Sequence, residues 1–283
     1  MTGVAEHKSV AEPRSVAEPR SVAEPRTRDP HLPVDPTTAG PLPAGVGAPA
    51  RTASVLLLAG FLGLTACLVL FGTLAEGIRA QEIYTLDTLA SPFLHGLASP
   101  AADAVMNAAT FAGSNLFIPP LFVLAIAILL WKHRPGAAAF LTVASGGSLL
   151  LNGLMKVVFQ RPRPQLPWAG VLPDYSFPSG HTMNSVAFYL ALVVIVWSVF
   201  GRRSGTIALI GAIILCGLIG MSRIYLGYHY FTDVLGGILA GVAWLLIVVA
   251  AFRSGPLARF WTLPRAADRA RHSARSSRPE DRS

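Results

Sequence analysis

Three short stretches place ionisable residues and turn formers at the borders of long apolar segments. They are KVVFQRPRP from Lys156 to Pro164, PSGH from Pro178 to His181, and SRIYLGYHYFTD from Ser222 to Asp233. Several cations at one point favour a dianion such as a phosphate monoester, and the forked donors of Arg suit its oxygens. Ser179 and Gly180 precede an apolar helix, where free backbone N–H groups and the helix dipole attract phosphate. This set of residues predicts a phosphate-binding site.

The two histidines suggest distinct tasks in such a site. Asp233 lies one helical turn beyond His229, so it can hold one imidazole nitrogen and leave the other free to attack phosphorus. His181, on another segment, can then protonate the leaving alkoxide as general acid. The sequence offers no acidic cluster to hold Mg²⁺, and we expect neither a metal nor another cofactor.

Each of these residues also has a simpler interpretation. Lys156 and Arg163 could anchor helix ends at the membrane surface, and His229 with Asp233 could be an ordinary interfacial pair. His181 could be a surface histidine, and the Pro and Gly beside it could only form a turn. The phosphate interpretation is favoured because the membrane topology predicted below places all of these residues on the same face of the membrane.

The composition is that of a membrane protein. Of 283 residues, 52% are hydrophobic and only 13% are charged, whereas soluble domains average about 25% charged residues. The apolar residues form blocks near the roughly 20 residues that one bilayer crossing needs. We therefore predict an all-α, polytopic protein with six transmembrane helices, at Ser54–Ala75, Leu116–Trp131, Ala137–Phe159, Met183–Phe200, Ile207–Tyr225 and Val234–Phe252.

The charges of the short loops predict the orientation. Lys132 and Arg134 follow the second span, and Arg202 and Arg203 follow the fourth, with no acid beside them. The positive-inside rule places these loops and both termini in the cytoplasm of a bacterial-type cell membrane. The phosphate site then lies on the extracytoplasmic face. The connection from residue 76 to 115 is amphipathic, and we expect one or two short interfacial helices there.

The two ends of the chain differ from the middle. Residues 1–52 contain three copies of SVAEPR and are rich in Pro and Gly, so we expect a disordered cytoplasmic tail. Residues 53–253 form the predicted six-helix membrane domain. Residues 254–283 form a second, Arg-rich tail, which we expect to face anionic lipid rather than nucleic acid.

The three stretches resemble the motifs of the type 2 phosphatidic acid phosphatase (PAP2) superfamily. The patterns KxxxxxxRP, PSGH and SRxxxxxHxxxD occur intact and in order. The resemblance implies that His229 is the nucleophile and forms a phosphohistidine, that Asp233 orients it, and that His181 protonates the leaving group. It further implies that the phosphoryl oxygens are bound by Lys156, Arg163, Ser179, Gly180 and Arg223.

The function expected from this resemblance is that of a metal-independent membrane lipid phosphatase. The chain resembles bacterial undecaprenyl-diphosphate and phosphatidylglycerophosphate phosphatases, so a polyprenyl diphosphate is the favoured substrate, and phosphatidic acid or phosphatidylglycerophosphate comes next. Transfer of the phosphoryl group to an alcohol is one alternative, and a lipid transporter or scaffold with a relic site is another. Vanadium haloperoxidases share the motifs, but they are soluble. The oligomeric state is left open.

Overall fold

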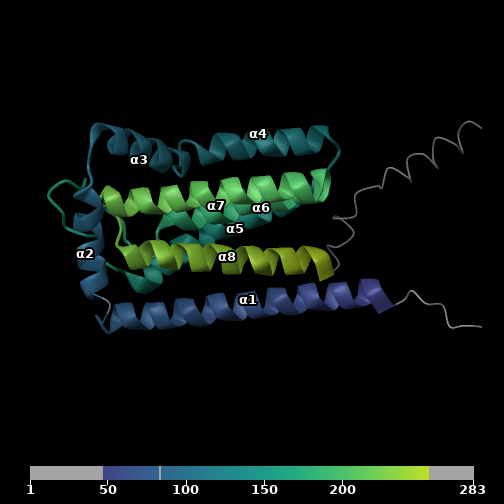
Figure 1. Ribbon diagram of the computed structural model, residues 1–283, viewed down its shortest axis with the longest axis horizontal. Coiled ribbons are helices and arrows are strands. Elements are labelled where there is room, and N and C mark those ends of the chain that lie inside the picture. Colours follow the sequence, from purple (N-terminus) through teal and green to yellow (C-terminus); the bar gives the residue numbers. More distant parts are fainter. Residues whose placement is uncertain (1–46, 83, 255–283) are drawn as a thin grey trace, which may run out of the picture. The chain divides into compact units, whose positions relative to one another are not determined.

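The computed structural model describes residues 47–82 and 84–254. The predicted N-terminal tail up to residue 46 and the C-terminal tail from residue 255 lie outside these described residues. The secondary structure in the described part is helical (Figure 1). The helices are α1 (Gly47–Arg79), α2 (Tyr84–His95), α3 (Pro100–Ala112), α4 (Ile118–Trp131), α5 (Pro135–Phe159), α6 (Gly180–Phe200), α7 (Arg202–Tyr225) and α8 (Phe231–Ser254).

Five of these helices, α1, α5, α6, α7 and α8, are long and apolar enough to cross a membrane. The second predicted span is the shorter helix α4, whose 14 residues rise by about 21 Å, less than the roughly 30 Å of a hydrocarbon core. Pro119 and Pro120 lie in its first turn, where the missing N–H groups have no helical partner to lose. The all-α membrane fold is confirmed, with five long spans and one short apolar helix.

Helix α6 packs against α5, α7 and α8 and forms the centre of the bundle. Its approach to α8 is close because α8 presents glycines to it. A Cβ at Gly237 would lie 2.9 Å from the carbonyl oxygen of Ser179, and one at Gly241 would lie 2.9 Å from that of Met183. Small residues at such spacing let two helix backbones approach closely in a membrane. This contact brings the start of α8 to the start of α6.

The connection between α1 and α4 contains two short helices, as the amphipathic pattern predicts. Ser99 caps α3 by accepting a hydrogen bond from the backbone N–H of Ala102, and Pro100 occupies the first turn. Helix α3 packs along α7, and α2 packs on α7 and α8. Figure 1 shows α2 running across the end of the bundle where α7 finishes and α8 begins.

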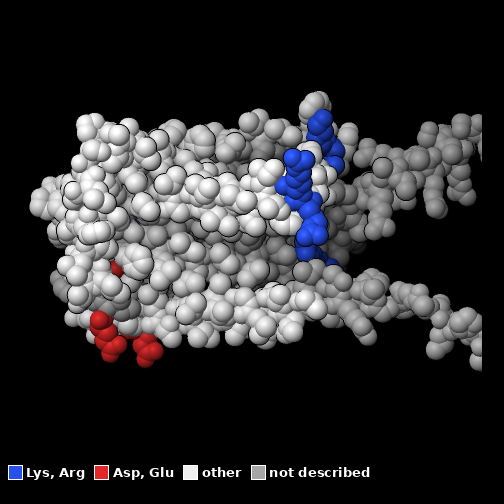
Figure 2. Space-filling view, in the orientation of Figure 1, with Lys and Arg blue, Asp and Glu red and all other residues white. Residues whose placement is uncertain are grey.

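The charged side chains seen in Figure 2 differ between the two ends of the described helices, although the cations Lys156, Arg163 and Arg223 line a cavity at the acidic end. Lys and Arg gather at the end where α4 joins α5 and α6 joins α7, while Asp and Glu are seen at the other end (Figure 2). Lys132, Arg202 and Arg203 are exposed in these connections. The charge asymmetry expected from the sequence is therefore present in three dimensions.

Candidate active site

The three polar stretches meet at the end of the bundle that α2 covers. Lys156 lies in the last turn of α5, Arg163 in the 160–179 loop, and Arg223 in the last turn of α7. A cavity of about 270 Å³ lies between them. Of the eight predicted site residues, six line it: Lys156, Arg163, Gly180, His181, Arg223 and His229.

The other two predicted residues lie behind the cavity wall. Ser179 is fully buried, and its backbone N–H donates to the carbonyl oxygen of Asp233 at 2.9 Å. This N–H is therefore engaged in the protein, and its bond ties the PSGH turn to the first turn of α8. Asp233 is also fully buried, directly behind His229.

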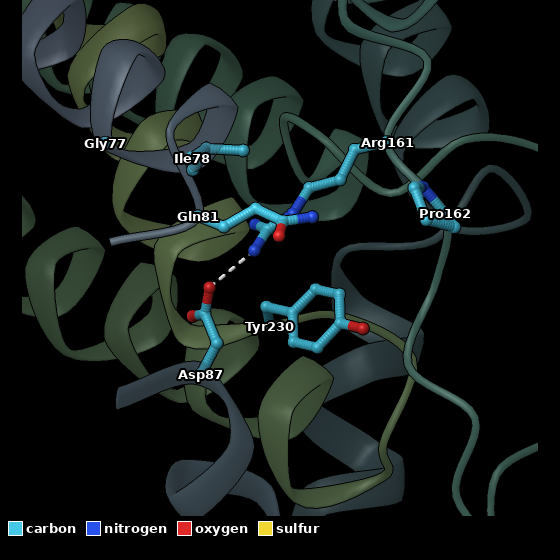
Figure 3. A pocket seen from close by; sticks show the side chains of 7 residues that line it. All are labelled: Gly77, Ile78, Gln81, Asp87, Arg161, Pro162 and Tyr230. Carbon is cyan, nitrogen blue, oxygen red and sulfur yellow. Dashed lines mark hydrogen bonds and ion pairs between the residues drawn. The ribbon is translucent and has the colours of Figure 1, made fainter. Parts of the chain in front are cut away.

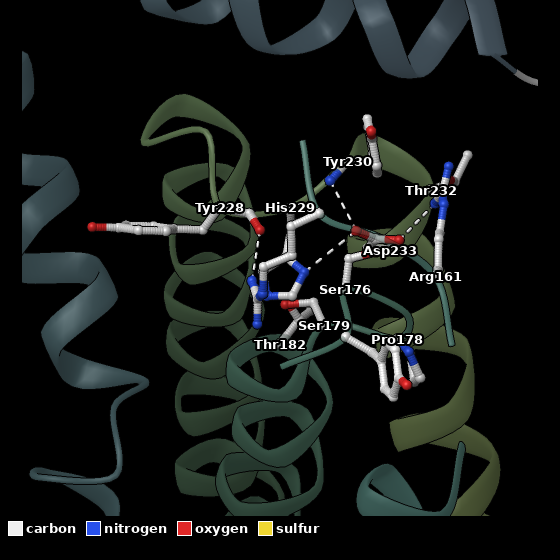
Figure 4. Close-up of polar contacts among 12 residues, drawn as sticks. Arg161, Ser176, Pro178, Ser179, Thr182, Tyr228, His229, Tyr230, Thr232 and Asp233 are labelled. Atoms are coloured by element: carbon white, nitrogen blue, oxygen red, sulfur yellow. Dashed lines mark hydrogen bonds and ion pairs between the residues drawn. The ribbon is translucent and has the colours of Figure 1, made fainter. Parts of the chain in front are cut away.

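His229 lies between an Arg donor and a carboxylate acceptor, in the loop that links α7 and α8 (Figure 4). Its Nδ1 is 3.3 Å from Asp233 Oδ2, and its Nε2 is 3.2 Å from Arg163 Nη1. A guanidinium can only donate, so Nε2 carries the lone pair and Nδ1 carries the proton. The lone pair of the ring is therefore on Nε2, beside Arg163.

Burial keeps this imidazole neutral. The pKa of His229 is lowered from 6.5 to about 4, chiefly because the ring is buried, and the charges of Arg163 and Arg223 act in the same direction. The hydrogen bond and charge of Asp233 oppose this shift only in part. At neutral pH the ring is a neutral base, as nucleophilic attack requires.

Three cations line the same cavity as His229, and each is held by a different protein group. Arg163 Nη1 donates to the carbonyl oxygen of Tyr228 at 2.7 Å, and Lys156 Nζ donates to that of Tyr175 at 2.6 Å. Arg223 donates to Thr110 Oγ1 on α3, but its buried Nε has no hydrogen-bond partner among the residues that the structure describes. An unsatisfied buried guanidinium N–H is costly, and an anionic oxygen is the partner that suits it best.

Sequence reasoning did not identify Asp174 as part of the site. Its carboxylate accepts hydrogen bonds from Lys156 Nζ and from Arg163 Nε and Nη2, the last at 2.6 Å. The residue lies in the loop between two motifs, and its only signal in the sequence was a single carboxylate in a loop that also carries Arg161 and Arg163. Lys156 and Arg163 thus share the carboxylate of Asp174 as a common partner.

Asn152 is a second site residue that the sequence did not reveal. It lies one turn before Lys156 on α5, and its Nδ2 donates to the carbonyl oxygen of Pro178 at 3.2 Å. A Cβ at Gly180 would lie 2.9 Å from Asn152 Oδ1. The glycine of PSGH therefore allows α5 and α6 to meet at this polar contact. A polar residue within an apolar span was the available signal.

The arrangement suits phosphoryl transfer. A dianion in the cavity would meet Lys156, Arg163 and Arg223 together with Nε2 of His229, and His181 reaches the same cavity from the first turn of α6. The two imidazoles thus reach the cavity from different elements, the loop between α7 and α8 and the first turn of α6. In the described residues no three His, Cys, Asp or Glu side chains come together as a metal site.

Comparisons with known proteins agree with this geometry. The profile of the PAP2 superfamily matches residues 136–254. Phosphatidylglycerophosphatase B of Bacillus subtilis (strain 168) is 29% identical over 180 residues, covering 63% of this chain and 89% of its own length. An Escherichia coli (strain K12) protein provisionally named an undecaprenyl-diphosphatase, YbjG, is 31% identical over 150 residues, covering 50% of this chain and 71% of its own.

A solved structure is similar to the same region. The crystal structure of a transmembrane PAP2-type phosphatidylglycerolphosphate phosphatase from Bacillus subtilis aligns with a TM-score of 0.63 and 28% sequence identity. The alignment covers 66% of this chain and 94% of that one. The similarity therefore extends over nearly the whole of that crystallised chain.

Proposed function

This chain belongs to the PAP2 superfamily, and from that premise we propose that it removes phosphate from a membrane lipid through a phosphohistidine at His229. The observation that carries the proposal is the pairing of His229 Nε2 with Arg163, in a cavity that Lys156 and Arg223 also line. A phosphoryl group there would lie among three cations and meet the nucleophilic nitrogen at once.

The reaction proceeds in two displacements. In the first, the lone pair of His229 Nε2 forms a bond to phosphorus, the bond from phosphorus to the leaving oxygen breaks, and protonated His181 gives that oxygen its proton. The leaving oxygen is the ester oxygen of a lipid monophosphate or the bridging oxygen of a lipid diphosphate. In the second, His181 takes a proton from water, the water oxygen attacks phosphorus, and the P–N bond breaks to release phosphate. Asp233 stabilises the positive charge that His229 acquires when it is phosphorylated. Lys156, Arg163 and Arg223 stabilise the charge on the equatorial oxygens.

An apolar cavity beside the polar one supports a lipid substrate. It measures about 190 Å³, lies between α4, α5 and α6, and is lined by side chains that include Ile118, Phe122 and Phe188. It shares Asn115, Leu149 and Asn184 with the phosphate cavity. One amphiphilic molecule can therefore place its phosphate on the cations and the start of its chain in the apolar cavity.

Among phosphorylated lipids, we place polyprenyl diphosphates first, and phosphatidylglycerophosphate and phosphatidic acid next. Similar proteins carry names for the first two of these activities. The protein contacts described above recognise phosphate and an apolar chain, and neither requires a glycerol group. We therefore expect a preference among these lipids rather than strict exclusion.

The site is proposed to face the extracytoplasmic side, with both termini in the cytoplasm. The exposed Lys132, Arg202 and Arg203 at the opposite end of the bundle, among the blue side chains in Figure 2, support this through the positive-inside rule. The test uses a variant in which Cys67 and Cys216 are replaced by Ala. A single cysteine is then placed at Val171, which is 91% exposed in the site loop, or at Arg203, which is exposed at the other end. An impermeant maleimide applied to intact cells should label Val171→Cys, and labelling of Arg203→Cys alone would reverse the orientation.

The function itself is tested by phosphate release from purified protein in detergent micelles. The panel contains a polyprenyl diphosphate, phosphatidylglycerophosphate and phosphatidic acid. His229→Asn should abolish release, while His133→Asn, which changes an exposed histidine at the far end of the bundle, should retain wild-type activity. Absence of release from every lipid, or full activity in His229→Asn, would overturn the proposal.

A further inference from the structure

A buried chain of charges runs behind the catalytic pair, on the side away from the phosphate cavity. Arg161 Nη1 donates to Asp233 Oδ1 at 2.6 Å, and its Nη2 donates to Asp87 Oδ2. The side chains of Asp87 and Asp233 are 1% and 0% exposed. Ionised groups are found at such depth only when they are paired, so the three side chains form one unit.

Asp87 brings the interfacial helix α2 into this unit. Its Oδ1 accepts from the backbone N–H of Thr232 at 2.9 Å, and its Oδ2 accepts from the hydroxyl of the same residue at 2.7 Å. The bond to the backbone places a carboxylate at the N-terminus of α8, where the helix dipole favours negative charge. A residue 145 positions away in the chain thus holds the turn that carries Asp233.

The carboxylate of Asp233 divides its two oxygens between different partners. Oδ1 receives Arg161, while Oδ2 receives the backbone N–H of Tyr230 at 2.9 Å and lies 3.3 Å from His229 Nδ1. Any change in the pairing of Oδ1 alters the charge available at Oδ2. The guanidinium of Arg161 therefore acts on His229 through a single intervening side chain, that of Asp233.

We propose that Arg161 and Asp87 are positioning residues of the phosphatase site, which set the orientation and the charge of Asp233 and, through it, the nucleophilicity of His229. Arg161 withdraws negative charge from Asp233, and Asp87 limits this effect because it shares the same guanidinium. The inference rests on the proposed role of His229 as nucleophile. A purely structural alternative is a strap that only fastens α2 to α8.

The surroundings of Arg161 favour the first interpretation. Its guanidinium lies over the ring of Tyr230, 4.3 Å from the centroid, and it borders a cavity of about 170 Å³ that Asp87, Gln81 and Pro162 also line (Figure 3). Arg161 and Asp87 thus lie between the His229–Asp233 pair and this separate cavity, rather than in the apolar core.

If Arg161 and Asp87 set the charge of Asp233, then removing either of them should change the pKa of His229 in a different way. The titratable groups around it are Asp87 on α2, Lys156 on α5, Arg161, Arg163 and Asp174 in the 160–179 loop, His181 on α6 and Arg223 on α7. Removing Arg161 leaves Asp233 without its cation, so the carboxylate holds the proton of His229 more strongly and the pKa of His229 rises. Removing the charge of Asp87 leaves Arg161 to Asp233 alone, so that pKa stays or falls.

The test is the pH dependence of kcat/KM, measured with the purified full-length chain and a phosphorylated lipid. Arg161→Met should move the acid limb upward by about one pH unit, as expected for loss of a charge in the immediate surroundings, and Asp87→Asn should not move it upward. Arg161→Lys keeps one buried cation for two carboxylates and should give a smaller upward shift. The matched controls are Arg79→Met and Asp103→Asn, which change an exposed cation and an exposed carboxylate at the same end of the bundle.

The outcomes separate the inference from the proposed function. If both Arg161 variants lose activity while the acid limb stays at the wild-type pH, the network is only a strap and the inference is wrong. If Arg161→Met does not fold, Arg161→Lys and Asp87→Asn decide in the same way. A wild-type protein that releases no phosphate would instead overturn the proposed function.

Discussion

Asp174→Asn should tighten the binding of phosphate-like anions. In the structure the Asp174 carboxylate occupies donors of both Lys156 and Arg163, which a bound phosphate would need. Burial alone would raise the pKa of Asp174, but the hydrogen bonds and charges of Lys156 and Arg163 outweigh it and hold the pKa below the ordinary 3.8. The competing charge is therefore present throughout any practical assay range.

The size of the effect follows from the exposure of this residue. Its side chain is 52% exposed, and a pair with that much solvent is worth about 0.2–1 kcal/mol. Two such pairs compete with the ligand, so their removal should favour binding by about 0.4–2 kcal/mol, or about 2- to 30-fold. The cations should keep their places, because the carbonyl oxygens of Tyr175 and Tyr228 still hold Lys156 and Arg163.

The assay is inhibition of p-nitrophenyl phosphate hydrolysis by inorganic phosphate and by vanadate. Asp174→Asn should lower both inhibition constants, whereas Asp103→Asn should leave them unchanged, since Asp103 accepts from Tyr225 on α7 and does not line the phosphate cavity. Weaker inhibition in Asp174→Asn would show that the carboxylate organises the two cations instead of competing for them. The reasoning would then be refuted, even if the enzyme remained active.

Three further predictions concern the chemistry. His181→Asn should reduce hydrolysis of a lipid monoester by about 10²–10⁴-fold, the usual contribution of a general acid. Its effect on p-nitrophenyl phosphate hydrolysis should be much smaller, because that leaving group needs no proton. His229→Asn should be inactive with both substrates, and the reverse pattern would exchange the two roles. Because Lys156, Arg163 and Arg223 supply the positive charge, activity should persist in excess EDTA, and loss that added Mg²⁺ restores would contradict this. The pKa of His229 is lowered to about 4, and only the neutral ring attacks. In the wild-type protein kcat/KM should therefore fall as the pH drops below about 4. A decline already complete at pH 6 would show that the pKa of His229 is not lowered this far.

The connection between residues 76 and 115 shows what periodicity can and cannot predict. Its amphipathic pattern predicted one or two short helices, and the structure has α2 and α3. The same pattern gave no indication that Asp87 turns inward, because its neighbours Leu86 and Leu89 are both exposed. Periodicity reports which face of a helix is apolar, but it does not report which partner a single carboxylate finds.

Sequence alone was sufficient for the membrane class, the approximate spans and the proximity of the motif residues. Each motif lies within a dozen consecutive residues at the end of an apolar segment, so helix geometry and loop charges place all three at one end of a bundle. Hydrophobic length also determines the spans, because unpaired backbone groups are excluded from lipid. These properties depend on local composition and need no knowledge of long-range contacts.

Tertiary structure alone revealed which charges pair behind and beside the nucleophile. Arg161 joins residues 74 positions before and 72 positions after it in the chain, and Asp174 bridges cations 18 and 11 positions away. Such pairings depend on how closely α2, α6 and α8 pack, which the glycines of α8 permit but do not specify. An ion pair is stabilised by the distance and burial of its two groups, and a linear pattern of residue types contains neither quantity.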